Sequence, residues 1–210
     1  MSSPAVMPVT SPEERSAALA AAVDALRAGE PVGVPTDTVY GLAADAADAG
    51  AVKRLFELKE RPYDRSIAVL VADVDGAAAL VELTERARRL AEGFWPGPLT
   101  IVAARTSAAP PHLGTGTTIG VRLPDDDVVR SLAASGPLAV TSANLHAAPT
   151  PATAQGVADL FPTLGLVIDG GSRPGASSTV VDMTGSTPAV LREGPVSLDE
   201  IMAATPGSAS

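Results

Sequence analysis

Several residue types that build sites or cross-links are scarce in this chain. There is no cysteine, which excludes disulfides and cysteine metal sites. The two histidines, His112 and His146, lie in separate predicted loops and are too few for a histidine-based metal site. No apolar run approaches the ~18 residues of a membrane-spanning helix. The first ten residues, MSSPAVMPVT, lack the charged and apolar regions of a secretory signal, so we expect a cytoplasmic protein.

Positive charge and aromatic residues are also sparse. The chain has two lysines, Lys53 and Lys59, and only one tryptophan, two tyrosines and three phenylalanines. Its net charge of -9 argues against a general surface for polyanions, which normally requires a basic stripe. The densest basic group is Arg86, Arg88 and Arg89, on a predicted helix whose solvated face explains it. We therefore expect weak or no direct binding of nucleic acid.

The 210 residues are 46% hydrophobic, enough to form the core of one domain. Ser11, Pro12 and Glu14 predict a helix with a capping box, and Gly29 ends it. Helices and strands then alternate, and this predicts an α/β sheet covered by helices. Two consecutive strands near the end predict a sheet that is not purely parallel. We predict a domain over residues 11–204, with flexible termini at 1–10 and 205–210.

Strands are predicted at 32–35, 67–72, 99–104, 119–123, 138–141, 166–169, 179–183 and 189–192. Further helices are predicted at 48–59, 73–81, 84–93, 125–134, 153–161 and 197–204.

The stretch from Pro35 to Ser66 concentrates the polar residues of greatest interest. It begins with PTDTVYG and continues into a helix that delivers Lys59-Glu-Arg61-Pro62. A lysine and an arginine two residues apart offer a point charge and a planar fork, which suit a triphosphate. The alternative is that both side chains lie on a solvated face and offset the negative end of the helix.

Other candidates lie far away in the sequence. Arg122 interrupts an apolar strand, so its side chain faces either water or a cleft containing a carboxylate or phosphate. Ser142 and Asn144 follow a strand, where ligands of α/β proteins commonly bind. They can equally form a turn that only ends the strand, and Ser177-Ser178-Thr179 has the same ambiguity. Neither standard nucleotide-binding glycine loop is present.

Seven motifs occur along the chain in a familiar order: PTDTVYGL, KxRPxxR, WPGPLT, VRLP, TSAN, SSTVVD and LREGP. In this order they resemble the YrdC/Sua5 family of threonylcarbamoyl-AMP synthases, over residues 11–204. The resemblance implies the compact YrdC-type form, with a twisted mixed sheet of about seven strands, helices on both sides and a basic cavity.

The resemblance also implies an activity, which is the synthesis of threonylcarbamoyl-AMP and pyrophosphate from ATP, L-threonine and bicarbonate or CO2. This nucleotidyltransferase reaction begins the t6A modification of tRNA, which a separate transferase completes. Mg2+ is implied as the cofactor, held mainly by the ATP phosphates, with no protein-only metal site. Two alternatives are a related enzyme that activates another carbamoyl compound and a non-catalytic RNA-binding module.

Residue by residue, the resemblance implies two sets of contacts, with Lys59 and Arg61 in the catalytic role. The implied ATP contacts are Lys59, Arg61, Arg65, Thr118, Ser142, Asn144, Thr150 and Arg192. The implied threonine contacts are Thr38, Arg122, Val140 and Ser178. The chain departs from common family patterns at Arg65, Ser66 and Leu70, which concern details of substrate contact and leave the charge pattern intact.

Overall fold

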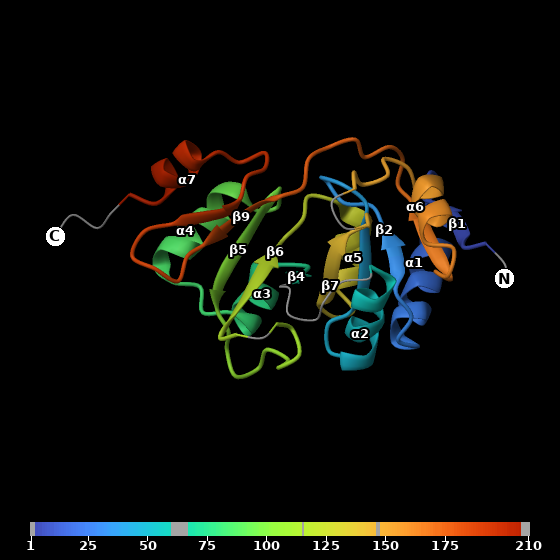
Figure 1. Cartoon of the computed structure of the whole chain (residues 1–210), viewed down its shortest axis with the longest axis horizontal. Coiled ribbons are helices and arrows are strands. Elements are labelled where there is room, and N and C mark those ends of the chain that lie inside the picture. Colours follow the sequence, from blue (N-terminus) through green and yellow to red (C-terminus); the bar gives the residue numbers. More distant parts are fainter. Residues whose placement is uncertain (1–2, 60–66, 115, 146–147, 207–210) are drawn as a thin grey trace.

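A computed structural model describes residues 3–59, 67–114, 116–145 and 148–206. In these residues the chain forms one twisted sheet of ten strands flanked by helices (Figure 1). The strands are β1 (Ala5–Pro8), β2 (Val32–Val34), β3 (Gly41–Asp45), β4 (Ala68–Leu70), β5 (Leu99–Ala104), β6 (Thr118–Arg122), β7 (Leu138–Ser142), β8 (Leu166–Asp169), β9 (Thr179–Asp182) and β10 (Ala189–Arg192). The helices are α1 (Pro12–Arg27), α2 (Ala49–Leu58), α3 (Val74–Leu80), α4 (Glu85–Phe94), α5 (Asp127–Ala133), α6 (Ala154–Leu160) and α7 (Leu198–Ala204).

The helices begin where their capping residues predict. Ser11 and Glu14 form the expected capping box of α1, with Pro12 as its first residue. Asp48 caps α2 by accepting from the backbone N–H groups of Gly50 and Ala51. None of the helices in the described ranges combines the length and apolar character needed to cross a membrane.

The sheet is mixed, as expected, but it is larger than the expected seven strands. Its order is β1-β8-β2-β3-β7-β4-β6-β5-β9-β10. The neighbours β1–β8, β2–β8, β4–β6 and β5–β9 are parallel, and the other neighbouring pairs are antiparallel. The sheet therefore brings strands from both ends of the chain to opposite edges.

Two strands were not predicted. Ala5–Pro8 forms β1 and pairs with β8, which corrects the prediction that residues 1–10 lie outside the domain as a flexible segment. Thr205, placed in the predicted C-terminal tail, is also buried.

The second unpredicted strand is β3. Gly41–Asp45 forms β3 between β2 and β7, although its sequence, GLAAD, contains no β-branched residue. Tertiary packing between two strands overrides the weak local preference there.

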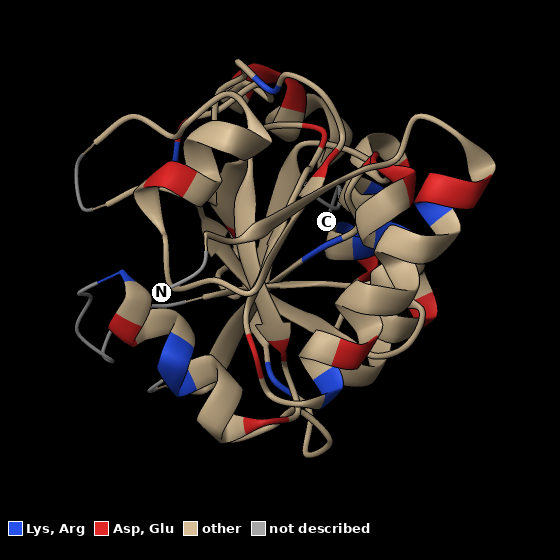
Figure 2. Ribbon diagram, turned by 90° about the vertical axis from the view of Figure 1, so that its right-hand side faces the viewer, with Lys and Arg blue, Asp and Glu red and all other residues tan. Residues whose placement is uncertain are grey.

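The core lies on both faces of the sheet. One hydrophobic cluster contains the buried residues of α1 and α5, and the other those of α2, α3, α4, α6 and α7. Neighbouring strand residues alternate between the clusters: Leu42 and Ala44 belong to one, and Ala43 to the other. Lys and Arg are interspersed with Asp and Glu on the surrounding helices and loops (Figure 2). The buried strand residues of the α1 and α5 cluster come from β2, β3, β4, β7 and β8. The cavity described next lies on the sheet itself and is lined by alternate strand residues such as Thr118, Gly120 and Arg122.

Candidate active site

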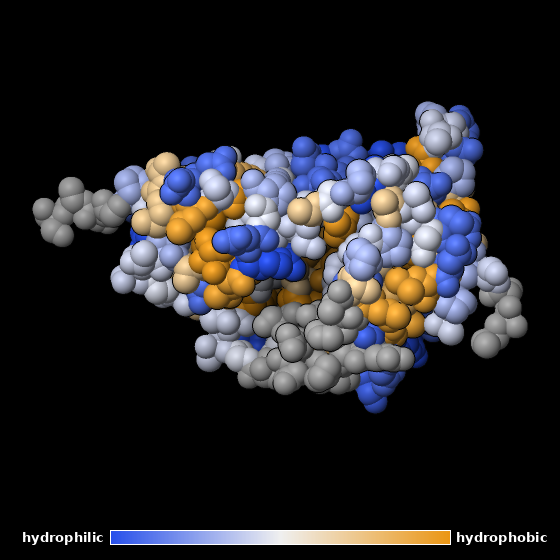
Figure 3. All heavy atoms as spheres, turned by 45° about the horizontal axis from the view of Figure 1, so that its top comes forward, coloured by the Kyte–Doolittle hydropathy of each residue, from blue (hydrophilic) through white to orange (hydrophobic). Residues whose placement is uncertain are grey.

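A cavity of about 480 Å³ is lined by residues from β3 to β7, from β9 and β10, and from adjoining loops. A hollow near the centre of one molecular face has apolar side chains inside it (Figure 3). Nine of the twelve predicted site residues line the cavity: Thr38, Lys59, Thr118, Arg122, Val140, Ser142, Asn144, Ser178 and Arg192. Thr150 is not among the lining residues, and Arg61 and Arg65 lie outside the described residues. The structure thus brings together motifs that are far apart in sequence.

Lys59 is buried in the structure. The sequence left two roles open for it, phosphate binding and a position on a solvated face. Lys59 caps the C-terminus of α2, and only 4% of its surface is exposed. Its Nζ donates to the Ser142 backbone oxygen at 2.5 Å and lies 3.2 Å from both Thr141 Oγ1 and Asn144 Oδ1. The solvated-face interpretation is therefore wrong for Lys59. The lysine joins the end of α2 to the end of β7.

Ser142 and Asn144 form a turn and also line the cavity. Asn144 Oδ1 accepts from the Ser142 hydroxyl at 2.5 Å, and Asn144 Nδ2 donates to the backbone oxygens of Leu145 and Ala148. The next residue after Ser142, Ala143, donates its N–H to Tyr40 O at 2.9 Å. Because both side chains are held by neighbours, the cavity presents them in a fixed arrangement beside Lys59. The two interpretations made from the sequence are thus compatible.

Arg122 pairs with a carboxylate of the protein itself, that of Asp37. The guanidinium donates to Asp37 Oδ1 at 2.5 Å, to Thr38 Oγ1 at 3.1 Å and to Gly97 O at 3.0 Å. Arg122 is 5% exposed, and burial lowers its pKa from the ordinary value while the Asp37 charge raises it. These contacts use three of its five N–H donors, and its side chain also lines the cavity.

The loop between β2 and β3 is fixed by its own hydroxyl groups. Thr36 Oγ1 donates to Val39 O at 2.6 Å and lies 3.0 Å from Thr38 Oγ1. It also accepts from the backbone N–H groups of Thr38 and Val39. The buried Tyr40 hydroxyl donates to Gly171 O at 2.8 Å. Its pKa is raised to about 12, chiefly by burial and then by the Asp169 carboxylate.

Ser178 lies on the opposite side of the cavity from β7 along the sheet order. Its hydroxyl lies 2.9 Å from Thr100 Oγ1 and 3.0 Å from Arg192 Nη2, and Arg192 Nε donates to Ser178 O. The register of β10 shifts between Val190 and Arg192, which marks an irregularity at the arginine. Arg192 itself is exposed, so it forms part of the cavity rim.

Sequence reasoning missed several cavity residues. Thr100 and Tyr40 lie inside the quoted motifs WPGPLT and PTDTVYGL, and hydroxyl groups within those motifs could have marked them. Asp182, which ends SSTVVD, is the one carboxylate among the described lining residues. Its Oδ1 accepts from the Thr184 N–H and hydroxyl. No group of three or more potential metal-ligating His, Cys, Asp or Glu side chains occurs within the described ranges.

The mixed sheet with its flanking helices defines an α/β protein. Its cavity contains a buried lysine, a buried arginine and a rim arginine, which suit the binding of small anions. Buried cationic groups beside several hydroxyls supply both charge and directed hydrogen bonds. The chain belongs to the Sua5/YciO/YrdC family, whose model, described as "Telomere recombination", matches residues 24–194.

Named relatives agree with this assignment. The chain is 41% identical over 182 residues to the threonylcarbamoyl-AMP synthase of Pyrococcus abyssi, covering 84% of this chain and 54% of that protein. It is 41% identical over 195 residues to a putative threonylcarbamoyl-AMP synthase of Mycobacterium tuberculosis, covering 90% of each. A crystal structure of P. abyssi Sua5 complexed with L-threonine matches with a TM-score of 0.88 and 37% identity, covering 95% of this chain and 60% of that one. The chain thus spans about half of the archaeal relative and most of the mycobacterial one.

Proposed function

We propose that this protein is a threonylcarbamoyl-AMP synthase that uses ATP, L-threonine and bicarbonate or CO2 and releases pyrophosphate. The observation that carries the proposal is the meeting of Lys59, Ser142 and Asn144 in the same cavity as Arg122 and Ser178. The names of the P. abyssi and M. tuberculosis relatives support the same activity.

The proposed chemistry requires no protein nucleophile. The threonine amine forms a bond to the carbon of CO2 and loses a proton, which gives a carbamate. A carbamate oxygen then attacks the α-phosphorus of ATP, and the bond from that phosphorus to the pyrophosphate oxygen breaks. The second step needs two anions, the carbamate and ATP, to be aligned and the growing charge to be neutralised.

We assign the binding and charge-stabilising roles to residues by their position in the cavity. Lys59 is held by neutral oxygens near the end of β7, where its charge can stabilise the phosphate groups. Arg122 has N–H donors beyond its contacts with Asp37, Thr38 and Gly97, and these suit the threonine carboxylate. Arg192, at the rim, is proposed to contact the nucleotide. The same nucleotide role stays a prediction for Arg61, Arg65, Thr118 and Thr150.

We propose that Mg2+ enters with ATP as part of the substrate. The described lining residues include one carboxylate, Asp182, and several hydroxyl groups. That donor set fits an ion held mainly by phosphate oxygens, which Mg2+ commonly accepts together with water. When bound, the ion neutralises negative charge on the phosphates.

The downstream partner is proposed to be a separate transferase that carries the threonylcarbamoyl group to tRNA. The net charge of -9 and the mixed surface charges disfavour a dedicated RNA-binding surface on this chain. The alternative of a non-catalytic RNA-binding module therefore has less support than the enzyme.

The test is pyrophosphate release from Mg-ATP by the purified protein, with threonine and bicarbonate each omitted in turn. We expect release only when both are present, together with a product of the mass of threonylcarbamoyl-AMP. Equal release without threonine would contradict the proposal and favour an enzyme that activates another carbamoyl compound. No release under any combination would favour the binding module.

A further inference from the structure

A segment of residues 170–178, here called the crossing segment, connects β8 to β9. Six strands lie between these two in the sheet, so the segment runs from one side of the sheet to the other, as the upper orange trace shows (Figure 1). It passes so close to the loop between β2 and β3 that a Cβ on Gly175 would lie 2.5 Å from Thr38 O. The segment ends at Ser178 in the cavity. Its placement and that of Thr38 therefore depend on each other.

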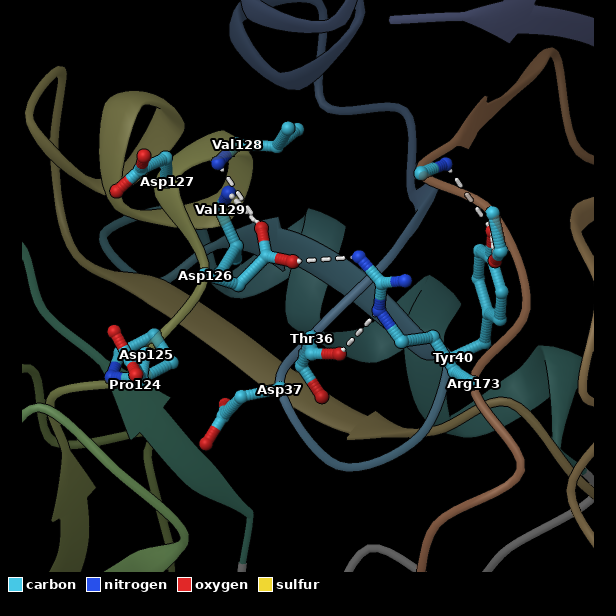
Figure 4. Close-up of polar contacts among 12 residues, drawn as sticks. Thr36, Asp37, Tyr40, Pro124, Asp125, Asp126, Asp127, Val128, Val129 and Arg173 are labelled. Carbon is cyan, nitrogen blue, oxygen red and sulfur yellow. Dashed lines mark hydrogen bonds and ion pairs between the residues drawn. The ribbon is translucent and has the colours of Figure 1, made fainter. Parts of the chain in front are cut away.

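Arg173 ties the crossing segment to two other elements (Figure 4). Its Nε donates to Thr36 O at 2.8 Å, and its Nη2 donates to Asp126 Oδ2 at 3.1 Å. Its backbone N–H donates to Ala152 O at 2.7 Å. Asp126 is itself fixed, because its Oδ1 caps α5 by accepting from the N–H of Val128 and Val129. The guanidinium thus links the start of α5 to the backbone of Thr36.

A short chain of contacts leads from Arg173 to the cavity. Thr36 Oγ1 lies 3.0 Å from Thr38 Oγ1, which in turn accepts from Arg122 Nη1 at 3.1 Å. Thr38 and Arg122 both line the cavity, whereas Arg173 does not. A shift of the Thr36 backbone would therefore change the position of the hydroxyl that helps to hold the Arg122 guanidinium.

We propose that Arg173 is a positioning residue for the threonine side of the site, acting through Thr36 on Thr38 and Arg122. This inference rests on the proposed function, because it assigns the Thr38–Arg122 side of the cavity to threonine. Among the described residues, the Arg173 side chain bonds to Thr36 and Asp126, and Lys59 bonds to Thr141 and Ser142, so the two share no partner there and nucleotide binding is affected much less.

The experiment compares four variants with the unsubstituted protein. Arg173→Ala removes both side-chain contacts, and Arg173→Lys keeps the charge but cannot reproduce the planar fork. Asp126→Asn retains the oxygen that caps α5 while removing the ion pair with Arg173. The matched control is Arg130→Ala: the Arg130 side chain is 25% exposed, as is that of Arg173, and it pairs with Asp125 and Asp127 without contacting Thr36.

Two readouts are needed, and both use the whole chain. Calorimetry with L-threonine should show about tenfold weaker binding for Arg173→Ala, about the effect of weakening one hydrogen bond between the site and the charged ligand. Arg173→Lys and Asp126→Asn should fall between that variant and the unsubstituted protein, and Arg130→Ala should stay within about twofold. In the pyrophosphate assay, KM for threonine should rise while KM for ATP and kcat change less than about threefold. Hydrogen exchange should be faster in a peptide covering residues 36–41 for both Arg173 variants.

The outcomes separate the two proposals. Unchanged exchange at residues 36–41, or unchanged threonine affinity in both Arg173 variants and Asp126→Asn, overturns the role of Arg173. An equal loss in Arg130→Ala also overturns it, because the effect would then follow general loss of surface ion pairs. If Arg173→Ala does not fold, Arg173→Lys and Asp126→Asn decide the matter. A failure of the unsubstituted protein to bind threonine instead refutes the proposed function, and this inference with it.

Discussion

Replacing Lys59 gives the sharpest test of the site, because the chain has one other lysine on the same helix for comparison. Lys59 is 4% exposed and joins α2 to β7, whereas the Lys53 side chain is 62% exposed and forms an i,i+4 pair with Glu57. We expect Lys59→Ala to lower turnover about 10²–10³-fold, the usual effect of losing one preorganised charge donor. Lys53→Ala should leave turnover within about twofold of the unsubstituted protein.

The stability change follows from the contacts of Nζ. Its removal leaves Ser142 O and Asn144 Oδ1 without the lysine donor, at about 1–3 kcal/mol for buried acceptors. An opposing term is the cost of burying an ammonium group, which the variant no longer carries. We therefore expect a net loss of about 1–2 kcal/mol, which lowers Tm by roughly 2–8 °C in a chain of this size. Lys53→Ala should change stability by less than ~0.5 kcal/mol.

The assay is steady-state pyrophosphate release at 25 °C, where each variant is shown by circular dichroism to be folded. Activity must fall far more than the folded fraction if the charge acts on the reaction. A Lys59→Ala enzyme with normal turnover per folded molecule would refute the catalytic role and leave the lysine only a link between α2 and β7.

Arg122→Lys should weaken threonine binding about 10–100-fold and ATP binding much less, because lysine cannot contact Asp37, Thr38 and a ligand carboxylate together; calorimetry with unchanged threonine affinity would make Arg122 purely structural. The raised pKa of Tyr40, about 12, predicts stability that is present below pH ~10 and lost by roughly 2–3 kcal/mol as pH rises to ~12. Urea unfolding of Tyr40→Phe should lack that part of the alkaline loss, and parallel curves for the two proteins would contradict it. Unmodified tRNA should bind no more tightly than micromolar at ~0.15 M salt in an anisotropy titration. Submicromolar binding undisturbed by ATP would reveal a dedicated RNA surface.

Local signals in the sequence were sufficient for many elements. The capping box at Ser11 and Glu14 located α1, and the apolar stripe of Val52, Leu55 and Phe56 located α2. These signals depend on residues close together in the chain, which the sequence displays directly. By contrast, β3 depends on its partners β2 and β7, so its alanine-rich sequence gave no indication of a strand.

The candidate site was predictable as a set of residue types and not as a geometry. Motifs identified nine residues that line the cavity, but the burial of Lys59 depends on β7, which lies more than 80 residues later. The pairing of Arg122 with Asp37 likewise joins residues 85 apart. Neither contact leaves a local pattern, because each forms only when the sheet order brings distant strands together.

The pairing of β1 with β8 has a consequence for synthesis on the ribosome. Ala5 is matched with Leu166, so the first strand of the chain has no partner until about 160 further residues have been made. At ~5–20 residues per second, that interval is roughly 8–30 s. During this time β8 cannot serve as an edge for β1 or β2, and both strands can meet other chains. Nascent molecules of this protein should therefore depend on chaperones before Leu166 emerges far more than after it.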